Sequence, residues 1–295
     1  MPIDQKKAAQ RALYAMYAED LFDSLKGLAN SHGTPALGAP LSDGMTLSAA
    51  DWDIAGEIRA SDSLGLLSRL AAIGDFAFDR LEYFYGFLLH RKTPNGVVAQ
   101  GDYLVIVRGT ELTVEWALDA CATPVNYPLG NGDTADVPIG FHAIYSSMVL
   151  VTQGGARSPL ASGITQVVGA KNVTVAGHSL GAALGTYLAF DLASGALGQR
   201  VDAALVASPS PGDAKLAERF YDVVASYTVV NWERDDVPKV PPYPFVAVRG
   251  STQLTLDDVT VSPTNALDPA CNHHAICYAR MLDPTLVLGP SYNCF

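Results

Sequence analysis

Apolar and polar residues alternate at a helical spacing in the first part of the chain. Between Lys6 and Leu25, apolar side chains return every three or four residues, which predicts an amphipathic helix. Residues 31–44 are rich in glycine and proline and should form a loop. A second helix is predicted over residues 62–79. We therefore expect residues 1–79 to be a helical N-terminal extension that packs on the core of the protein.

The pattern changes at Tyr83, where aromatic and β-branched residues become frequent. Such residues favour strands over Tyr83–His90 and Val97–Val107. The Asn95-Gly96 pair between them is typical of a tight hairpin turn. The predicted sheet therefore begins with antiparallel strands.

After Val107, short apolar strands alternate with helices. Helices are predicted at 141–151, 160–169, 180–192 and 215–223, and strands at 173–176, 201–207 and 225–231. A late hairpin is expected over 245–256, and a closing helix after Cys271. This alternation is typical of an α/β fold with a mostly parallel central sheet, an antiparallel start and helices on both faces. No repeat or clear linker divides the chain, so we predict one domain over residues 1–295.

Composition and charge narrow the range of partners. Hydrophobic residues make up 49% and charged residues 17% of the 295 positions, which excludes a disordered chain. The formal net charge of −11 repels phosphate backbones, so we expect no nucleic-acid partner. We expect no transmembrane segment, because no apolar run is long enough, and no secretory signal, because the first twenty residues carry six charges. The location is left open between the cytoplasm and a signal-independent export route.

One short motif contains a candidate nucleophile. Gly177-His178-Ser179-Leu180-Gly181 fits the Gly-x-Ser-x-Gly pattern, with an apolar strand before it and a helix of small residues after it. A strand–turn–helix of this kind exposes a serine hydroxyl on a sharp turn above the sheet, and the first N–H groups of the helix suit a developing oxyanion. A phosphate-binding loop would need the spacing G-x-G-x-x-G, which this segment lacks. Ser179 is therefore predicted to be a nucleophile.

A serine nucleophile needs a histidine base downstream of it in an α/β-hydrolase. His32, His90 and His142 precede the serine, and His178 lies in the turn itself, where its side chain should point away from the hydroxyl. The chain order therefore leaves two neighbouring histidines, 273 and 274, as candidates.

The base in turn needs a carboxylate that fixes its tautomer. The acidic cluster Glu233–Asp236 directly follows the predicted strand 225–231. Catalytic residues gather at the carboxyl ends of strands in such sheets, so this cluster is the candidate acid segment.

Five stretches together resemble the class 3 lipase family, which includes filamentous-fungal triacylglycerol lipases and bacterial and plant relatives. In chain order they are Val107–Asp119, Gly140–Tyr145, Val175–Gly181, Ala207–Asp213 and Val229–Pro242. The resemblance covers about residues 80–280 and implies an α/β-hydrolase fold. It also implies hydrolysis of carboxylic esters, most directly triacylglycerols, by a Ser-Asp-His triad through an acyl-enzyme, with no cofactor and no metal.

The family pattern implies a role for particular positions. Its acid lies three residues before the proline that precedes a Pro-Pro pair, which is Asp235, with Asp236 as the rival. Its histidine lies five residues before a tyrosine on the closing helix. Counted back from Tyr278, that histidine is His273, with His274 as the rival.

The same pattern implies an oxyanion hole and a lid. The oxyanion donors would be the N–H of Leu180 and the Thr110 of the Arg-Gly-Thr turn, with Asp119 orienting the threonine side chain. In family members the segment after this turn forms a short lid helix that is apolar underneath. The apolar residues there are Leu112, Val114, Trp116 and Leu118. We therefore expect a lid that contacts acyl chains and opens at a lipid–water interface.

Several alternatives stay open. Phospholipase A1 and feruloyl or aryl esterase activities are the alternative ester substrates. A non-catalytic binding module with a hydrolase fold is a second class of function, although such modules usually lack a triad member. The cluster from Cys271 to Cys277 is too crowded for a zinc site. A disulfide of Cys271 with Cys277, or of either one with Cys294, is expected if the protein is exported.

Overall fold

The computed structural model describes residues 4–25, 47–61, 82–93, 98–99, 101–109, 123–264, 268–286 and 294–295. The expected loop at 31–44, the helix at 62–79 and the turn at 95–96 lie outside these residues.

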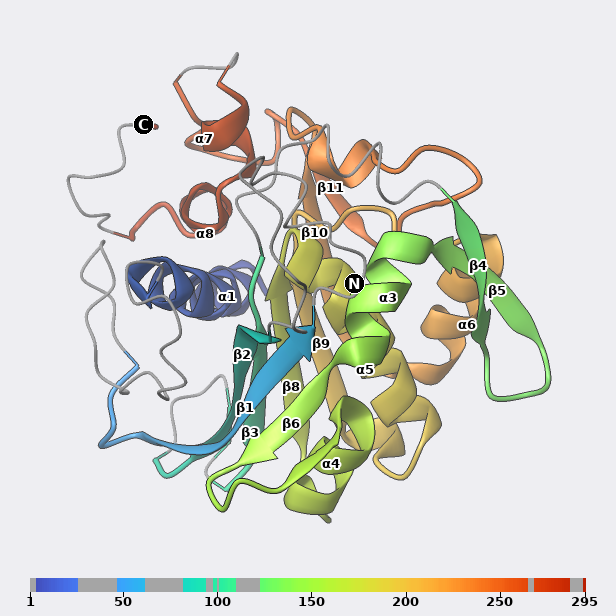
Figure 1. Cartoon of the computed structure of the whole chain (residues 1–295). Helices are drawn as coiled ribbons and strands as arrows, with labels where there is room; N and C mark the ends of the chain where they lie inside the picture. The colour runs from blue at the N-terminus through green and yellow to red at the C-terminus, as the bar shows by residue number, and fades with distance from the viewer. Residues whose placement is uncertain are drawn as a thin grey trace, which may run out of the picture.

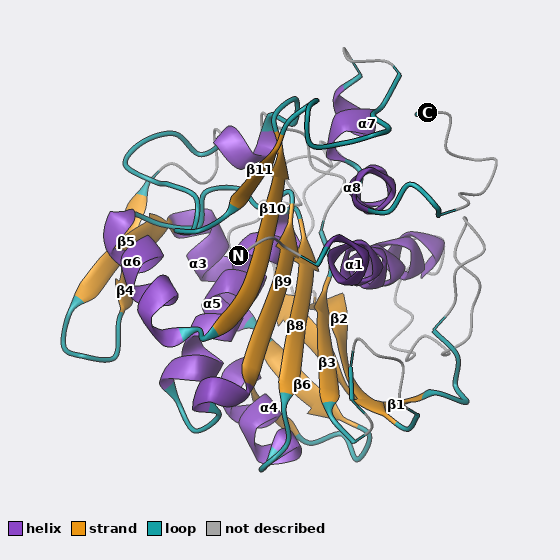
Figure 2. Ribbon diagram, turned by 180° about the vertical axis from the view of Figure 1, so that it is seen from behind, coloured by secondary structure: helices purple, strands orange, loops and turns teal. Residues whose placement is uncertain are grey.

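A nine-stranded sheet runs through the described part of the chain (Figures 1 and 2). In spatial order its strands are β11 (Thr252–Leu254), β10 (Ser226–Trp232), β9 (Val201–Val206), β8 (Val173–His178), β3 (Tyr103–Val107), β2 (Glu82–Arg91), β1 (Trp52–Ser61), β6 (Val149–Thr152) and β7 (Arg157–Pro159). Five neighbouring strands, β11, β10, β9, β8 and β3, pair in parallel with one another. The remaining strands, β2, β1, β6 and β7, extend the sheet beyond β3 by antiparallel pairing. The predicted α/β sheet with an antiparallel start is therefore confirmed.

Helices cover both faces of this sheet, as predicted. On one face lie α3 (Ile139–Ser147), α4 (Leu160–Val168), α5 (Leu180–Ser194) and α6 (Ala214–Val223), next to the hairpin of β4 (Pro124–Pro128) and β5 (Thr134–Pro138). On the other face α1 (Gln5–Leu25) packs against β8, β3, β9 and α8 (Ala275–Leu282), as Figure 2 shows. The short helix α7 (Pro269–His273) directly precedes α8.

Three local expectations differ from the structure. A helix was predicted at 141–151, but the observed helix ends at Ser147, and residues 149–151 of the predicted range belong to strand β6. A short apolar run fits a buried strand as well as a helix, and the extended backbone of Met148 separates the two elements here. The hairpin expected over 245–256 does not form, because β11 pairs in parallel with β10 instead. Finally, β1 lies inside the segment 1–79 that was expected to be helical.

The apolar core is divided by the sheet. The largest cluster fills the space between the sheet and α3–α6. A second cluster joins α1 and α8 to β10, with Met16, Trp232 and Ile276 among its fully buried side chains. Because α8 packs against α1 and shares a buried core with β10, the residues just before it are positioned at the carboxyl edge of the parallel strands.

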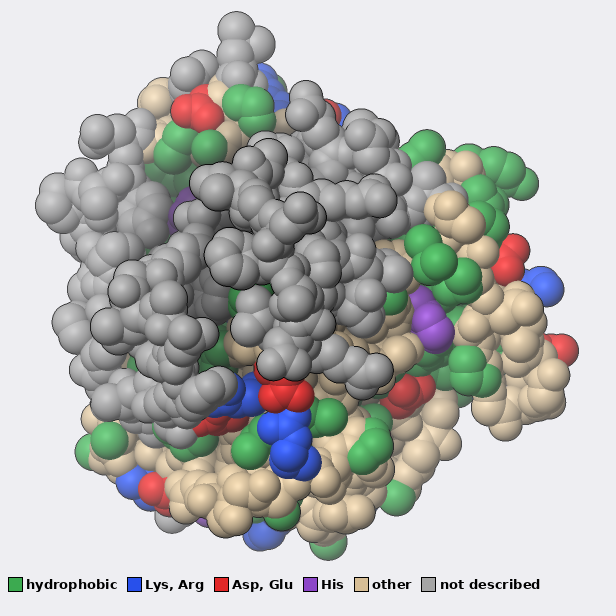
Figure 3. All heavy atoms as spheres, in the orientation of Figure 1, with side chains coloured by type: hydrophobic (Ala, Val, Ile, Leu, Met, Phe, Trp, Pro, Cys, Tyr) green, Lys and Arg blue, Asp and Glu red, His purple; other side chains and the backbone are tan. Residues whose placement is uncertain are grey.

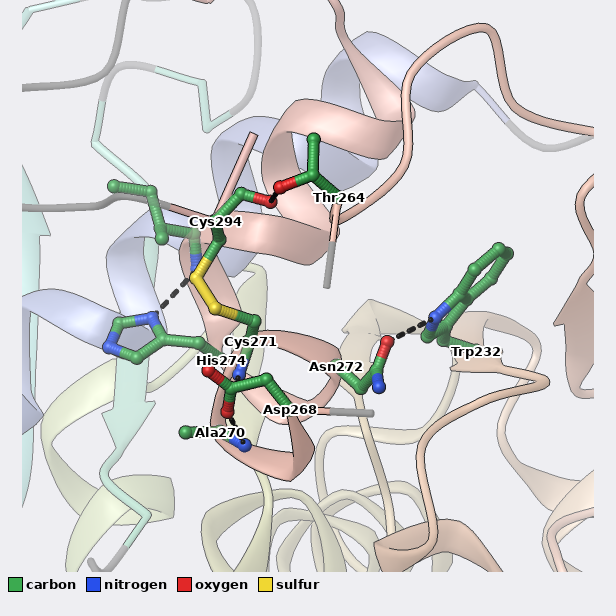
Figure 4. Close-up of a disulfide and its surroundings, with 9 residues drawn as sticks. Trp232, Thr264, Asp268, Ala270, Cys271, Asn272, His274 and Cys294 are labelled. Carbon is green, nitrogen blue, oxygen red and sulfur yellow. Dashed lines mark hydrogen bonds between the residues drawn. A yellow bond between two sulfur atoms is a disulfide. The ribbon is translucent and has the colours of Figure 1, made fainter. Parts of the chain in front are cut away.

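A disulfide holds the C-terminal residues against α7 (Figure 4). It joins Cys271 to Cys294, with Cα atoms 5.5 Å apart, which is one of the expected pairings. The backbone N–H and the hydroxyl of Thr264 both donate to the carbonyl oxygen of Cys294, at 2.7 and 3.3 Å. Cys277 is a buried free thiol, and burial raises its pKa to about 12. Both sulfur atoms of the bridge are used, so neither is available to a metal ion.

We expect loss of this bridge to destabilise the fold. It spans 23 residues, so cross-link entropy predicts that the Cys271→Ser/Cys294→Ser variant loses about 3 kcal/mol in the free energy of unfolding. Urea denaturation measures this loss. Wild type that has been unfolded and reduced should match the variant, and the variant itself should not respond to reductant. A loss below about 1 kcal/mol would contradict a stabilising role for the bridge.

Candidate active site

Ser179 lies on a strained turn between the central strand β8 and helix α5. Its backbone φ is 55°, in the left-handed region that residues other than glycine rarely adopt. The flanking glycines are required by close contacts. A Cβ added to Gly177 would lie 2.3 Å from the carbonyl oxygen of Gly181, and one added to Gly181 would lie 2.3 Å from that of Val107. The turn therefore forces the Ser179 side chain out at the carboxyl edge of the sheet.

The structure brings the serine, one histidine and one aspartate into a single hydrogen-bonded chain. The Nε2 atom of His273 lies 2.8 Å from the Oγ of Ser179, and its Nδ1 lies 2.8 Å from the Oδ2 of Asp235. A carboxylate accepts hydrogen bonds, so Nδ1 carries the proton and Nε2 offers a lone pair to the hydroxyl. This is the arrangement in which an imidazole can take the proton from a serine nucleophile.

Asp235 is buried at 2% exposure, and both of its carboxylate oxygens accept hydrogen bonds. Its Oδ1 accepts from the N–H of Val237 at 2.9 Å, and its Oδ2 also accepts from the hydroxyl of Tyr278 at 2.7 Å. The same hydroxyl accepts from the N–H of Trp232 at 2.8 Å. Burial, followed by the charge of Asp235, raises the pKa of Tyr278 well above its usual value, so the tyrosine stays a donor. Tyr278 was only a positional marker in the sequence, and its contact with the acid required the folded structure.

The two rival residues face elsewhere. Asp236 is exposed and pairs with the ammonium group of Lys239, at 2.7 Å. The Nδ1 atom of His274 accepts the N–H of Ile276 at 3.3 Å and so begins helix α8 (Figure 4). In this geometry Asp235 and His273, rather than their neighbours, lie in the hydrogen-bonded chain with Ser179.

The candidate oxyanion site is described in part. Leu180 is the first residue of α5, so its N–H lies among those that have no acceptor within the helix. The strand β3 ends beside Gly177, and the guanidinium of buried Arg108 donates to the carbonyl oxygens of Phe84 and Gly109, at 2.6 and 2.8 Å. The remaining candidates, Thr110, Asp119, Leu112, Val114, Trp116 and Leu118, lie outside the described residues.

On the face drawn in Figure 3, acidic and basic side chains of the described residues are interspersed among polar and hydrophobic ones. None of the helices in the described part of the chain combines the length and the apolarity that crossing a membrane requires.

Comparison with known proteins gives a consistent result. A family model described as Lipase (class 3) matches residues 104–245. Phospholipase A1-II 3 of Oryza sativa subsp. japonica is 32% identical over 223 residues, which cover 66% of this chain and 52% of that protein. Phospholipase A1-II 4 of the same rice is 32% identical over 209 residues, 63% of this chain and 52% of that protein. The chain thus spans about half the length of the curated relatives it matches.

Solved structures show the same fold at lower sequence identity. A mutant form of the Penicillium cyclopium protein MDLA has a TM-score of 0.54 and 18% identity, over 86% of this chain and 81% of that one. The Rhizomucor miehei lipase propeptide complex has a TM-score of 0.52 and 18% identity, over 97% of this chain and 82% of that one. These similarities establish the α/β-hydrolase fold.

Proposed function

We propose that this chain, which belongs to the class 3 lipase family, is a serine ester hydrolase that cleaves lipid esters through an acyl-enzyme. The observation that best supports the proposal is the hydrogen-bonded chain from Ser179 through His273 to Asp235, with both contacts at 2.8 Å. Family membership makes ester hydrolysis the expected chemistry, and this geometry supports the roles we propose for the three residues as nucleophile, base and orienting acid.

The proposed reaction uses each group in turn. The Oγ of Ser179 attacks the ester carbonyl carbon while His273 Nε2 takes the hydroxyl proton, and the imidazolium that forms is stabilised by Asp235. The N–H of Leu180 donates to the oxyanion, and we propose Thr110 as the second donor. His273 then gives the proton to the leaving alcohol, and the ester carbon–oxygen bond breaks. A water molecule deprotonated by His273 releases the acid and restores the serine.

Two lipid substrates are proposed. Triacylglycerol is the first, because the family resemblance implies it. Phospholipid is the second, because rice proteins 32% identical to this chain are named as phospholipases A1. Both reactions hydrolyse a carboxylic ester, so the same three residues serve either substrate.

The test is a panel of p-nitrophenyl esters, triacylglycerol emulsions and phospholipid vesicles labelled at the first or second acyl position. We expect acid release that a fluorophosphonate abolishes, with the adduct found on the peptide that contains Ser179. Preferential release from the first acyl position would favour the phospholipase A1 assignment. Binding of lipid without any hydrolysis, and without fluorophosphonate labelling, would favour the non-catalytic module.

We expect Asp235→Asn to lower kcat by about 10⁴-fold, with a much smaller change in KM. An amide can donate to Nδ1 and so stabilise the wrong tautomer, and it does not stabilise the imidazolium. Initial rates on a soluble ester measure the effect, with far-ultraviolet circular dichroism as a check on folding. The matched control is Asp236→Asn, which should stay within about twofold, because that side chain is exposed. A larger loss of kcat in Asp236→Asn than in Asp235→Asn would instead assign the role of the orienting acid to Asp236.

We also propose a lid formed by Leu112, Val114, Trp116 and Leu118. If it covers the site in water, activity on a short-chain ester should rise sharply once the ester exceeds its solubility limit. Activity measured across that limit tests this. A rate that follows ordinary saturation through the limit would rule out interfacial opening while leaving the triad untouched.

A single domain over residues 1–295 remains part of the proposal. α1, from the start of the chain, packs against α8 near its end, and β1 pairs with β2 and β6 within the central sheet. Segments from both ends of the chain thus share one sheet and its cores.

A further inference from the structure

The histidine immediately before the candidate nucleophile contacts the candidate base. His178 is the last residue of β8, and it is 3% exposed. Its Nε2 atom lies 2.8 Å from the backbone carbonyl oxygen of His273. The two imidazole rings also lie against each other, with centroids 4.8 Å apart and an interplanar angle of 36°. Two residues that are far apart in the sequence are therefore joined by both backbone and ring contacts.

The chemistry of the acceptor fixes the direction of this hydrogen bond. A backbone carbonyl oxygen only accepts, so the proton of this bond is on Nε2 of His178. The carbonyl belongs to His273, the last residue of α7. The last carbonyl groups of a helix receive no hydrogen bond from an N–H of the same helix. A histidine side chain can satisfy such a carbonyl. His178 thus caps α7 at the residue that bears the candidate base.

This cap acts on a short element. α7 has only five residues, and the chain leaves it at His274 in an extended conformation before α8 begins. Its other anchors lie earlier in the helix, as Figure 4 shows. The Oδ1 atom of Asn272 accepts from the indole N–H of Trp232 at 3.2 Å, and Cys271 carries the disulfide. The hydrogen bond from His178 ties the backbone at the end of α7 to the strand leading into Ser179.

We propose that His178 is a positioning residue for the proposed hydrolysis, on which this inference rests. It holds the backbone of His273 so that Nε2 of that residue stays in hydrogen-bond reach of the Ser179 hydroxyl. β8 lies between β3 and β9 in the centre of the sheet, so the reference point is rigid. One dipeptide, His178-Ser179, then places both the nucleophile and the backbone of its base. A displacement of about 1 Å between reacting groups can cost about 100-fold in rate, so a single hydrogen bond at this place has a large effect.

Three substitutions separate the hydrogen bond from the ring contact. In His178→Gln the amide nitrogen can occupy the place of Nε2, so the donor is kept. In His178→Asn the amide nitrogen falls near the place of Nδ1, too short to reach the carbonyl. His178→Phe keeps a ring against His273 and removes the donor. We expect kcat on a soluble ester to fall about 10- to 100-fold in the Asn and Phe variants, with KM within about twofold, and Gln to recover most of the rate.

A matched control is His90→Gln, which removes another strand histidine that lies against a ring, that of Tyr103, at the opposite end of the sheet. It should leave kcat unchanged. Fluorophosphonate labelling of Ser179 gives a second readout, because it needs the same proton transfer but no substrate release. The labelling rate should follow kcat across the variants.

The outcomes distinguish the two proposals. A kcat equal to that of wild type in the Gln, Asn and Phe variants, with wild-type hydrolysis intact, would overturn the role of His178 and leave the hydrolase proposal standing. Equal losses in all three would assign the effect to the imidazole itself and overturn positioning by the N–H. A wild type that neither hydrolyses esters nor reacts with the fluorophosphonate would instead overturn the proposed function.

Discussion

Replacing Ser179 by alanine is expected to lower kcat for ester hydrolysis by about 10⁴- to 10⁶-fold. The variant loses the attacking oxygen, and with it the acyl-enzyme route. The residual rate would come from direct attack of water on an ester whose developing oxyanion the candidate donors stabilise. KM should change little, because the hydroxyl contributes little to ground-state binding. The measurement is single-turnover and steady-state kinetics on a p-nitrophenyl ester with highly purified protein, since trace wild type would dominate such a low rate.

The backbone turn at Ser179 also predicts how Ser179→Ala affects the stability of the fold. Ser179 holds a φ of 55°, and alanine is no better suited to it than serine, so the free energy of unfolding should stay within about 1 kcal/mol of wild type. Ser226→Ala is a matched control, because that serine is exposed and donates to Asp202 at the amino edge of the sheet. It should retain full activity. If Ser179→Ala hydrolysed esters at a wild-type rate and no longer reacted with the fluorophosphonate, the serine would not be the nucleophile.

The second large effect is expected from His273→Ala, which should also lower kcat by about 10⁴- to 10⁶-fold. The imidazole joins Ser179 to Asp235: its Nε2 lies 2.8 Å from the serine Oγ, and its Nδ1 lies 2.8 Å from the aspartate Oδ2. Its removal therefore leaves the hydroxyl without a base. Steady-state rates from pH 6 to 10 measure the loss. Some activity should return at high pH, where hydroxide in solution replaces the missing base.

His274→Ala is the neighbouring control. Its Nδ1 atom caps α8 by accepting the N–H of Ile276, so this variant should lose about 1 kcal/mol of stability and keep kcat within a few-fold of wild type. The double variant Ser179→Ala/His273→Ala should be no slower than either single one, because the residues act as one unit. Losses that multiply in the double variant would contradict a shared proton-transfer step.

The central part of the fold was predictable because its signals are local. The apolar strand 173–178, the glycines around Ser179 and the small-residue helix that follows are contiguous, and each constrains the next through contacts only a few residues away. The antiparallel half of the sheet was predicted less well. β6 lies in a short apolar run that fits a helix equally well, and β1 pairs with β2 and β6, from distant parts of the sequence. Pairing of that kind leaves little trace in a local pattern.

Local sequence patterns predicted the type of chemistry and the segments proposed to supply it: a serine on a strand–turn–helix, followed by an acidic segment and a histidine segment. They did not choose between neighbours. Asp235 and Asp236, or His273 and His274, have similar chemistry and nearly the same position in the chain, and only the direction of each side chain separates them. That direction depends on contacts made across the fold by Tyr278, Val237 and the turn between α7 and α8. The contact of His178 with the candidate base also left no local signal, because ninety-odd residues separate the two in the chain and only folding brings them together.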